Sequence, residues 1–427
     1  MLSSSISQYY YNFGFGNFIP PAALDAGHPP LFYSYIAFLM KVFGKSLWVV
    51  HLSILPFTLL GILSFVRILD FFSFPKKNQL LAVFLYFCIP AVTTQQMMVS
   101  YDMALLSLYL SAIYAVLFNR RILFSFVLIL IVGVSLRGIV ALVSIFFTLY
   151  ILNDKKFKST LRWVLLMIPA LIFCFVWYYF HKMQTGWWLS TSSASWSGQR
   201  GIVDVLGFFK NLISLARCFF DYGIVTFTIF YFFHFLKGKI IDKLILIWLI
   251  PLLVFALSFL PFRNPINHRY FLIVYVLMIP YVVIFLTKRR FLFSVLVGVL
   301  LLLSNFMIYP GKISNGWDCT LAHHSYFSLR KQFNAYFIQH KLDRTQIGTV
   351  FPMSTSFSTT DFSEDTTAML NVNGSNIESV PYVLYSNIAN DFSDEQMDKL
   401  SNWKIVRQDH LGLVSMSLLQ NPNFTTK

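Results

Sequence analysis

The sequence contains little charge, and the charge that it has is unevenly placed. Only 12% of its 427 residues are charged and 57% are hydrophobic, whereas soluble proteins carry about 25% charged residues. Glutamate is absent from residues 1–310, which contain 24 Lys/Arg and seven Asp. This composition excludes a water-soluble enzyme and predicts a polytopic membrane protein.

The positive net charge does not indicate nucleic-acid binding. The total of +15 divides into +17 over residues 1–310 (24 minus 7) and −2 over residues 311–427 (9 Lys/Arg minus 11 Asp/Glu). Nucleic-acid-binding domains instead gather their cations in one patch or stripe. Here the cations lie between apolar runs, so nucleic acid is excluded as a partner.

Cysteine is also scarce. The four residues Cys88, Cys174, Cys218 and Cys319 include no pair at short spacing. This excludes a disulfide framework and a cysteine-based zinc site. His323-His324 near Cys319 lacks a third clear ligand, so no metal site is predicted there.

Ten apolar segments approach the roughly 20 residues that cross about 30 Å of hydrocarbon. They are 48–70, 79–98, 102–118, 122–134, 138–152, 161–180, 220–236, 243–262, 270–287 and 291–309. The fourth and fifth are short and meet at residues 135–138, which favours a hairpin. We therefore predict a mainly α, ten-span bundle over residues 48–310, after an N-terminal segment 1–47.

The connectors between these segments alternate between basic and non-basic, which predicts their sidedness. The basic set, expected in the cytoplasm, is Lys76-Lys77, Arg120-Arg121, Lys155–Lys158, Lys237–Lys239 and Lys288–Arg290. The other connectors and both ends of the chain are then expected outside. Export of a 47-residue N-terminal segment requires a signal. Either a first span precedes residue 1, or the amphipathic stretch 31–43 assists insertion.

The C-terminal region differs in kind from the bundle. Residues 311–427 contain alternating segments at 347–351 and 382–385 and a turn-rich stretch at 354–360. These patterns predict a small α/β or α+β domain outside the cytoplasm.

Ionisable residues near the hydrocarbon boundary are functional candidates because they are costly there. Six are expected at the outer surface: Asp25, His28, Asp102, Arg137, His268 and Arg269. Structural roles are the alternative: a helix N-cap for Asp102, a snorkelling anchor for Arg137 and an interfacial belt at 268–270. Because these residues gather at one surface, they favour a lipid-phosphate site over a pump or channel. Trp187 and Trp188, in the outer loop 186–200, are expected to cover a sugar or to lie at the interface.

The run Asp25-Ala-Gly-His-Pro-Pro-Leu-Phe32, followed by Lys41-Val-Phe-Gly44, resembles the D-x-G-H-P-P-L…K-x-F-G signature of GT-C membrane glycosyltransferases. These include the glycosyltransferase family 39 protein mannosyltransferases and the lipid A aminoarabinose transferases. Three further matches are Asp102 after Pro90, Arg137 in the next hairpin, and His268-Arg269-Tyr270. Asn315–Asp318 and the outer domain resemble bacterial members. The resemblance covers essentially the whole chain, and its most specific part is the His-Pro-Pro run.

The resemblance implies transfer of a hexose or pentose from a polyprenyl-phosphate carrier, usually with inversion. The acceptor would be a glycolipid, cell-envelope glycan or protein at the outer face of the bacterial inner membrane. Asp25 and Asp102 would be the catalytic acids, one of them a general base. Arg137 and Arg269 would bind the phosphate, with His28 and His268 as orienting groups. Some members also use a divalent metal, so a metal-dependent reaction stays open.

The chain departs from the family pattern at its start. Members usually carry an acidic motif before the His-Pro-Pro run, whereas residues 1–21 contain no acid. Three interpretations stay open: Asp25 replaces that base, the base precedes residue 1, or this branch is inactive.

Two other functions also stay open. A non-enzymatic transporter or flippase for lipid-linked glycans would carry polar groups through the depth of its bundle. A polysaccharide polymerase or ligase would rely on a large outer loop rich in Arg and His.

Overall fold

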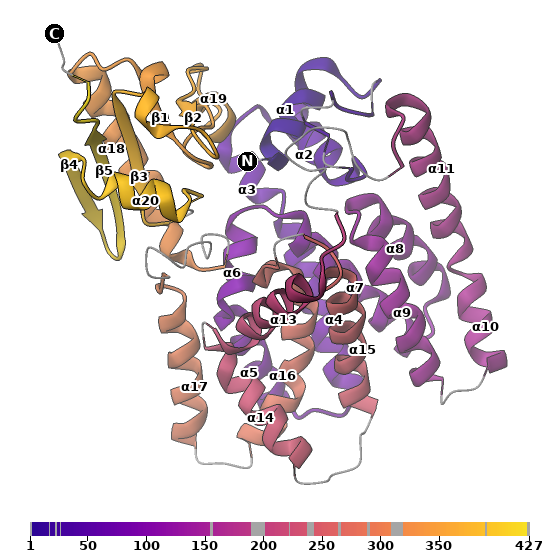
Figure 1. The fold of residues 1–427 in the computed structure, drawn as a ribbon. Helices are drawn as coiled ribbons and strands as arrows, with labels where there is room; N and C mark the ends of the chain where they lie inside the picture. The colour runs from indigo at the N-terminus through magenta and orange to yellow at the C-terminus, as the bar shows by residue number, and fades with distance from the viewer. Residues whose placement is uncertain are drawn as a thin grey trace. The chain divides into compact units, whose positions relative to one another are not determined.

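The computed structural model describes residues 2–16, 18–21, 24–25, 27–153, 157–188, 201–221, 223–236, 243–263, 266–287, 291–308, 319–388 and 391–424. The chain is mainly helical, with a small sheet near its C-terminus (Figure 1). It forms two compact units, one over Ile6–Leu302 and one over Leu303–Lys427. Each unit is described by itself below.

Except at 2–13, 31–43 and 205–220, the helices before the sheet domain coincide with predicted apolar segments. They are α1 (Leu2–Phe13), α2 (Leu31–Phe43), α3 (Leu47–Leu52), α4 (Leu55–Phe71), α5 (Lys76–Cys88), α6 (Pro90–Met97), α7 (Tyr101–Leu117), α8 (Arg121–Val134), α9 (Gly138–Leu152), α10 (Phe157–Leu165), α11 (Ile168–Thr185), α13 (Val205–Phe220), α14 (Ile224–Leu236), α15 (Lys243–Phe259), η2 (His268–Phe271), α16 (Leu272–Leu286) and α17 (Phe291–Ser304). Prolines at the first helical positions, such as Pro90 in α6 and Pro169 in α11, divide two predicted segments into helix pairs. Proline suits this position because its missing N–H has no partner in the first turn anyway.

Helix length limits how many segments can cross a membrane alone. Among the described residues, Leu47–Phe71 and His268–Leu286 are long and apolar enough. Three pairs would each make one span with a bend of 65° (α5 with α6), 44° (α10 with α11) or 100° (α13 with α14), which gives up to five. The other apolar helices have 10–17 residues. Ten crossings therefore stay a prediction.

Helix α7 lies at the centre of the helical unit, with nearly all of its side chains buried. It packs against α4, α8, α9 and α16. A Cβ at Gly61 of α4 would lie 2.7 Å from the Ser107 hydroxyl oxygen, so glycine permits the close approach of α4 and α7. The hydroxyls of Ser64 and Ser111 are 2.9 Å apart in the same interface. Helices in a membrane gain little from hydrophobic burial, because lipid is as apolar as their side chains. Small residues that permit close packing, and hydroxyl groups that form hydrogen bonds between helices, stabilise such contacts instead.

The predicted hairpin between α8 and α9 is present. Ser135 is extended (φ −156°, ψ 147°) and ends α8. A Cβ at Gly138 would lie 2.2 Å from the carbonyl oxygen of Ile131, so only glycine fits there. Arg137 precedes this glycine, and its backbone N–H donates to the Ser135 hydroxyl over 3.2 Å. The backbone of the turn therefore fixes where the Arg137 side chain starts.

The C-terminal unit has an α+β arrangement. Its elements are η3 (Leu321–His323), α18 (His324–Gln339), η4 (Arg344–Gln346), β1 (Ile347–Thr349), α19 (Phe357–Thr360), β2 (Leu370–Asn371), η5 (Ile377–Ser379), β3 (Tyr382–Ser386), α20 (Asp394–Leu400), β4 (Lys404–Leu411) and β5 (Val414–Gln420). The five strands have the order β2-β1-β3-β5-β4. Strand β1 pairs in parallel with β2 and β3, and β5 pairs antiparallel with β3 and β4. The strands predicted at 347–351 and 382–385 coincide with β1 and β3.

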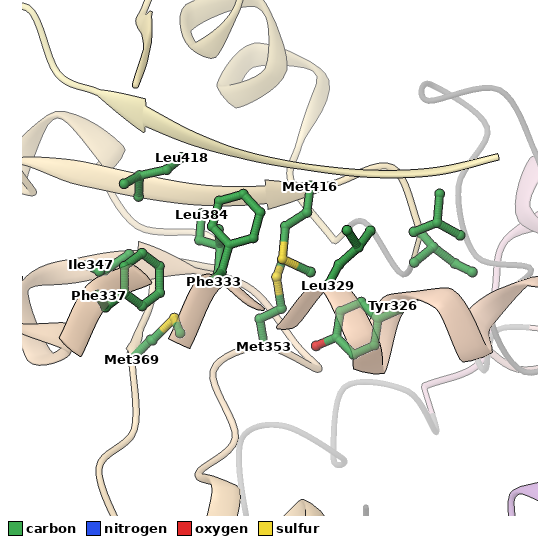
Figure 2. Close-up of a cluster of buried hydrophobic side chains, with 12 residues drawn as sticks. Tyr326, Leu329, Phe333, Phe337, Ile347, Met353, Met369, Leu384, Met416 and Leu418 are labelled. Atoms are coloured by element: carbon green, nitrogen blue, oxygen red, sulfur yellow. The ribbon is translucent and has the colours of Figure 1, made fainter. Parts of the chain in front are cut away.

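Helix α18 covers one face of this sheet. Its buried residues Tyr326, Leu329, Phe333 and Phe337 recur every three or four positions, which places them on one side of a helix. They pack on residues from the sheet and its loops: Ile347, Met353, Met369, Leu384, Met416 and Leu418 (Figure 2). The C-terminal unit thus has a hydrophobic core of its own.

Candidate functional site

Asp102 lies in the first turn of α7. The N-cap of this helix is Ser100, whose hydroxyl oxygen accepts a hydrogen bond from the Asp102 backbone N–H over 3.0 Å. The alternative in which Asp102 itself caps the helix is therefore wrong. The Asp102 carboxylate instead makes ion pairs.

Two arginines from distant parts of the chain approach the Asp102 carboxylate. Arg137 Nη1 lies 2.6 Å from Asp102 Oδ1. Arg269 Nε, from η2, lies 4.0 Å from Asp102 Oδ2. The Asp102 side chain is 3% exposed, and those of Arg137 and Arg269 are 11% and 28% exposed. Two cations and one anion leave this group, which we call the arginine cluster, with one net positive charge.

Aromatic rings hold the arginine cluster in place. The guanidinium of Arg137 lies 4.1 Å from the ring centroid of Tyr270 and 5.3 Å from that of Tyr101. Arg137 Nη2 also donates to the Tyr101 hydroxyl over 3.0 Å. The Arg269 guanidinium also contacts Tyr270, at 5.2 Å from the ring centroid. Cation–π contacts and hydrogen bonds together restrict how the Arg137 fork can rotate.

His28 connects the His-Pro-Pro turn to this cluster. The backbone N–H of Leu136 donates to His28 Nδ1 over 3.2 Å. Because Nδ1 is thereby an acceptor, the ring proton lies on Nε2, which is 3.3 Å from the Tyr101 hydroxyl. His28 therefore supports both the hairpin that carries Arg137 and the tyrosine that binds it.

His268 faces a different acid, although it neighbours Arg269 in sequence. Its Nε2 lies 3.4 Å from Asp221 Oδ2, and Arg217 Nε lies 3.8 Å from the same oxygen. Sequence reasoning missed Arg217 and Asp221. Their spacing of four residues at the end of an amphipathic helix was the available signal.

Asp25 lies in a second buried pair rather than in the arginine cluster. Its Oδ2 is 2.9 Å from His181 Nε2, and its Oδ1 accepts the Gly27 backbone N–H over 2.8 Å. The Asp25 and His181 side chains are only 4% and 1% exposed. Sequence reasoning missed His181, although it follows the predicted span 161–180 directly, in the kind of boundary position that singled out Asp102.

The residues around these acids do not fit a divalent metal ion. In the part of the chain that the structure describes, no three His, Cys, Asp or Glu side chains converge as ligands. Asp102 faces guanidinium groups and Asp25 faces one imidazole, whereas Mg²⁺ and Ca²⁺ require several oxygen ligands.

Some of the predicted features lie outside the described residues. They are Asn315–Asp318, residues 189–200 of the outer loop, Lys155-Lys156, Lys237–Lys239 and Lys288–Arg290.

Comparison with known proteins bears on the fold. No family model and no curated protein matches the sequence. Among solved structures, the chain is similar to ArnT from Cupriavidus metallidurans, determined as a crystal structure bound to undecaprenyl phosphate, with a TM-score of 0.50 and 14% sequence identity. The similarity covers 67% of this chain and 55% of the ArnT chain, so the match spans about half the length of that protein. The chain therefore shares the fold of ArnT over the matched part, which supports the GT-C fold that the His-Pro-Pro run predicted.

Proposed function

We propose that this protein transfers a sugar from a polyprenyl-phosphate carrier to an acceptor hydroxyl. The observation that carries the proposal is the arginine cluster, in which Arg137 and Arg269 both approach the carboxylate of Asp102. Its net positive charge suits a phosphate. The fold similarity to ArnT, whose structure contains undecaprenyl phosphate, supports a lipid-linked phosphate in particular.

The two arginines differ in how firmly Asp102 holds them. Arg137 is nearly buried and its Nη1 contacts the carboxylate at 2.6 Å. Arg269 is more exposed, and its Nε stands 4.0 Å away. We therefore assign the first contact with the incoming phosphate to Arg269, and we assign Arg137 to the oxygens that gain charge as the sugar leaves. Guanidinium forks bind phosphate through two parallel hydrogen bonds.

The reaction needs one bond made, one bond broken and one proton moved. The acceptor oxygen attacks the anomeric carbon, and the bond from that carbon to the carrier phosphate oxygen breaks. The phosphate leaves with the electron pair, and the arginine cluster stabilises the developing charge. The acceptor proton passes to a carboxylate acting as general base. Of the two acids that the sequence indicated, Asp102 lies beside the arginines, whereas Asp25 lies in the separate pair with His181.

The proposal extends to the side of the membrane and to the acceptor. The basic connectors favour an outer-face site in a bacterial inner membrane. A glycolipid, cell-envelope glycan or protein would then supply the hydroxyl. The sugar is a hexose or a pentose in this proposal.

Binding of undecaprenyl phosphate to the purified full-length protein in nanodiscs tests the phosphate assignment. Arg269→Gln should weaken binding about 10- to 100-fold, because a hydrogen bond to a charged group contributes roughly 1.5–3 kcal/mol. Arg263→Gln is the matched control, since Arg263 is an exposed arginine six residues away. Equal affinity in the Arg269→Gln protein would contradict the assignment.

Turnover is tested separately with a panel of undecaprenyl-phosphate sugars and membrane acceptors. The expected result is release of undecaprenyl phosphate with sugar on the acceptor. Binding without release, together with movement of the lipid between leaflets of proteoliposomes, would favour a transporter instead.

A further inference from the structure

The buried pair of Asp25 and His181 has no part in the reaction proposed above. The two residues are 156 positions apart in the sequence, and both are almost fully enclosed. Removing one partner of a buried charged pair strongly destabilises a protein, because the other charge is left buried and uncompensated. The Asp25–His181 pair therefore needs a role other than direct participation in the reaction.

Hydrogen-bond geometry defines the state of this pair. His181 Nδ1 lies 2.8 Å from the carbonyl oxygen of Trp187, which can only accept. His181 Nε2 lies 2.9 Å from the Asp25 carboxylate. An imidazolium paired with a carboxylate satisfies both contacts, because both of its ring nitrogens donate. Both Asp25 oxygens are engaged, one by His181 and one by the Gly27 N–H.

This engagement argues against Asp25 as the general base. A base must come within hydrogen-bond reach of the acceptor hydroxyl. Asp25 is only 3% exposed, and each of its oxygens already accepts a hydrogen bond from the protein.

The pair instead begins a chain of contacts that ends at the arginine cluster. Asp25 binds the backbone of Gly27, which has a φ of +69° that favours glycine. The next residue, His28, lies 3.3 Å from the Tyr101 hydroxyl, and Tyr101 accepts from Arg137 Nη2 at 3.0 Å. At its other end the chain reaches Trp187 through His181.

We propose that Asp25 and His181 are positioning residues. Their ion pair, with the hydrogen bond from Gly27 to Asp25, fastens Asp25 and Gly27 to the C-terminal end of α11, and the adjacent His28 then holds Tyr101 and the Arg137 hairpin in the arrangement that binds phosphate. The effect on carrier binding rests on the proposed function. The mechanical link from Asp25 to His28 does not.

Asparagine at position 25 separates positioning from acid–base chemistry. In Asp25→Asn, the side-chain oxygen can still accept from Gly27 and the amide can donate to Nε2 of a neutral His181. His181 Nδ1–H can still donate to Trp187, so all three hydrogen bonds survive without a base. Asp25→Ala loses the two hydrogen bonds that Asp25 itself makes, to Gly27 and to His181.

Binding and turnover give the first readout. Asp25→Ala and His181→Ala should weaken undecaprenyl phosphate binding about tenfold or more, and Asp25→Asn should restore most of the binding and turnover. If Asp25→Asn binds the lipid normally but loses more than about a hundredfold in turnover, Asp25 is the base and the positioning role is overturned. His181→Gln, which keeps one donor, replaces His181→Ala if that protein does not fold.

Nitrogen-15 spectra of the histidine side chains give a readout that needs no carrier. His181 should show two protonated ring nitrogens in the wild type and one in Asp25→Asn, with His181→Gln used for assignment. The His28 signals should move in Asp25→Ala and stay in place in Asp25→Asn. Unchanged His28 signals in a folded Asp25→Ala protein would overturn the link. If these signals move as expected while the wild type fails to bind undecaprenyl phosphate, the proposed function fails and the link stands.

Discussion

The Asp102 carboxylate and the Arg137 guanidinium lie 2.6 Å apart, and together they join the start of α7 to the turn between α8 and α9. Both side chains are nearly buried, so neither charge is well solvated. The pair therefore sets the geometry where α7 begins, α8 ends and α9 begins, as well as the charge of the site.

Changing Asp102→Asn should separate binding from turnover. The variant removes the negative charge that Asp102 brings to the arginine cluster, so undecaprenyl phosphate should bind as tightly as in the wild type or more tightly. Turnover should fall by at least about a hundredfold, the usual scale for loss of a general base. Ser100→Ala removes the helix cap, leaves the carboxylate in place and should cost only about 1 kcal/mol of stability. Weakened binding with normal turnover in Asp102→Asn would contradict this role.

Replacing Gly138 by alanine should displace the Arg137 hairpin. The new Cβ would lie 2.2 Å from the Ile131 carbonyl oxygen, so backbone must move. We expect a loss of stability of about 1–3 kcal/mol and weaker undecaprenyl phosphate binding. Gly16→Ala is the control, because a Cβ at Gly16 meets no atom within 4 Å. Thermal unfolding and lipid binding measure the two effects, and equal melting of both variants would show that the turn tolerates a side chain.

Truncating Phe333 should destabilise the C-terminal unit. Phe333 is 0% exposed in the core between α18 and the sheet, and a buried Phe→Ala change costs about 3–5 kcal/mol. Ile338 lies on the same helix but is 67% exposed, so Ile338→Ala should have little effect. Hydrogen exchange of the α18 peptides in the full-length protein measures both. Similar exchange in the two variants would speak against the described core.

Acidification should weaken the C-terminal unit in two stages. Burial lowers the pKa of His323 from 6.5 to about 4. As the pH falls, His323 therefore binds a proton in the unfolded chain before it does so in the folded one. The contribution of His323 to the free energy of unfolding is full above about pH 6.5 and falls by on the order of 3 kcal/mol as the pH approaches 4. The hydrogen bonds from Arg344 hold the pKa of Asp365 below its usual range, so the stability from that pair is lost only at still lower pH.

Hydrogen exchange of the η3 and α18 peptides between pH 7 and 4, corrected for intrinsic rates, tests the first stage. His323→Asn should flatten the pH dependence between 6.5 and 4. An unchanged profile in that variant would assign the loss to other groups.

Local composition predicted the helices better than their breaks. Apolar runs identify helices because the composition of each run by itself indicates that the segment is buried. The division at Pro90 and the helix α13 were not predicted. Helix α13 lies in the connector between the predicted segments 161–180 and 220–236, where Lys210 and Arg217 interrupt apolar residues that recur with the spacing of an amphipathic helix.

The candidate site shows the same limit. Asp102, Arg137 and Arg269 could be found singly, because charges near hydrocarbon are costly. Their contact could not, because it depends on how η2 and the α8–α9 turn pack on α7. His268 illustrates the difference: it adjoins Arg269 in sequence yet lies against Asp221. The His181 partner of Asp25 has no sequence signal beyond its place at the end of an apolar run.

The separation of 156 residues between Asp25 and His181 also sets an order of assembly. At roughly 5–20 residues per second, a ribosome needs on the order of ten to thirty seconds to make the chain between them. During that time the turn of residues 25–28 has no imidazole to bind, while α2 through α9 are already synthesised. The arginine cluster is therefore among the last parts of the helical unit to reach its final geometry, so a nascent chain that ends before α11 should carry Asp102 and Arg137 without this support.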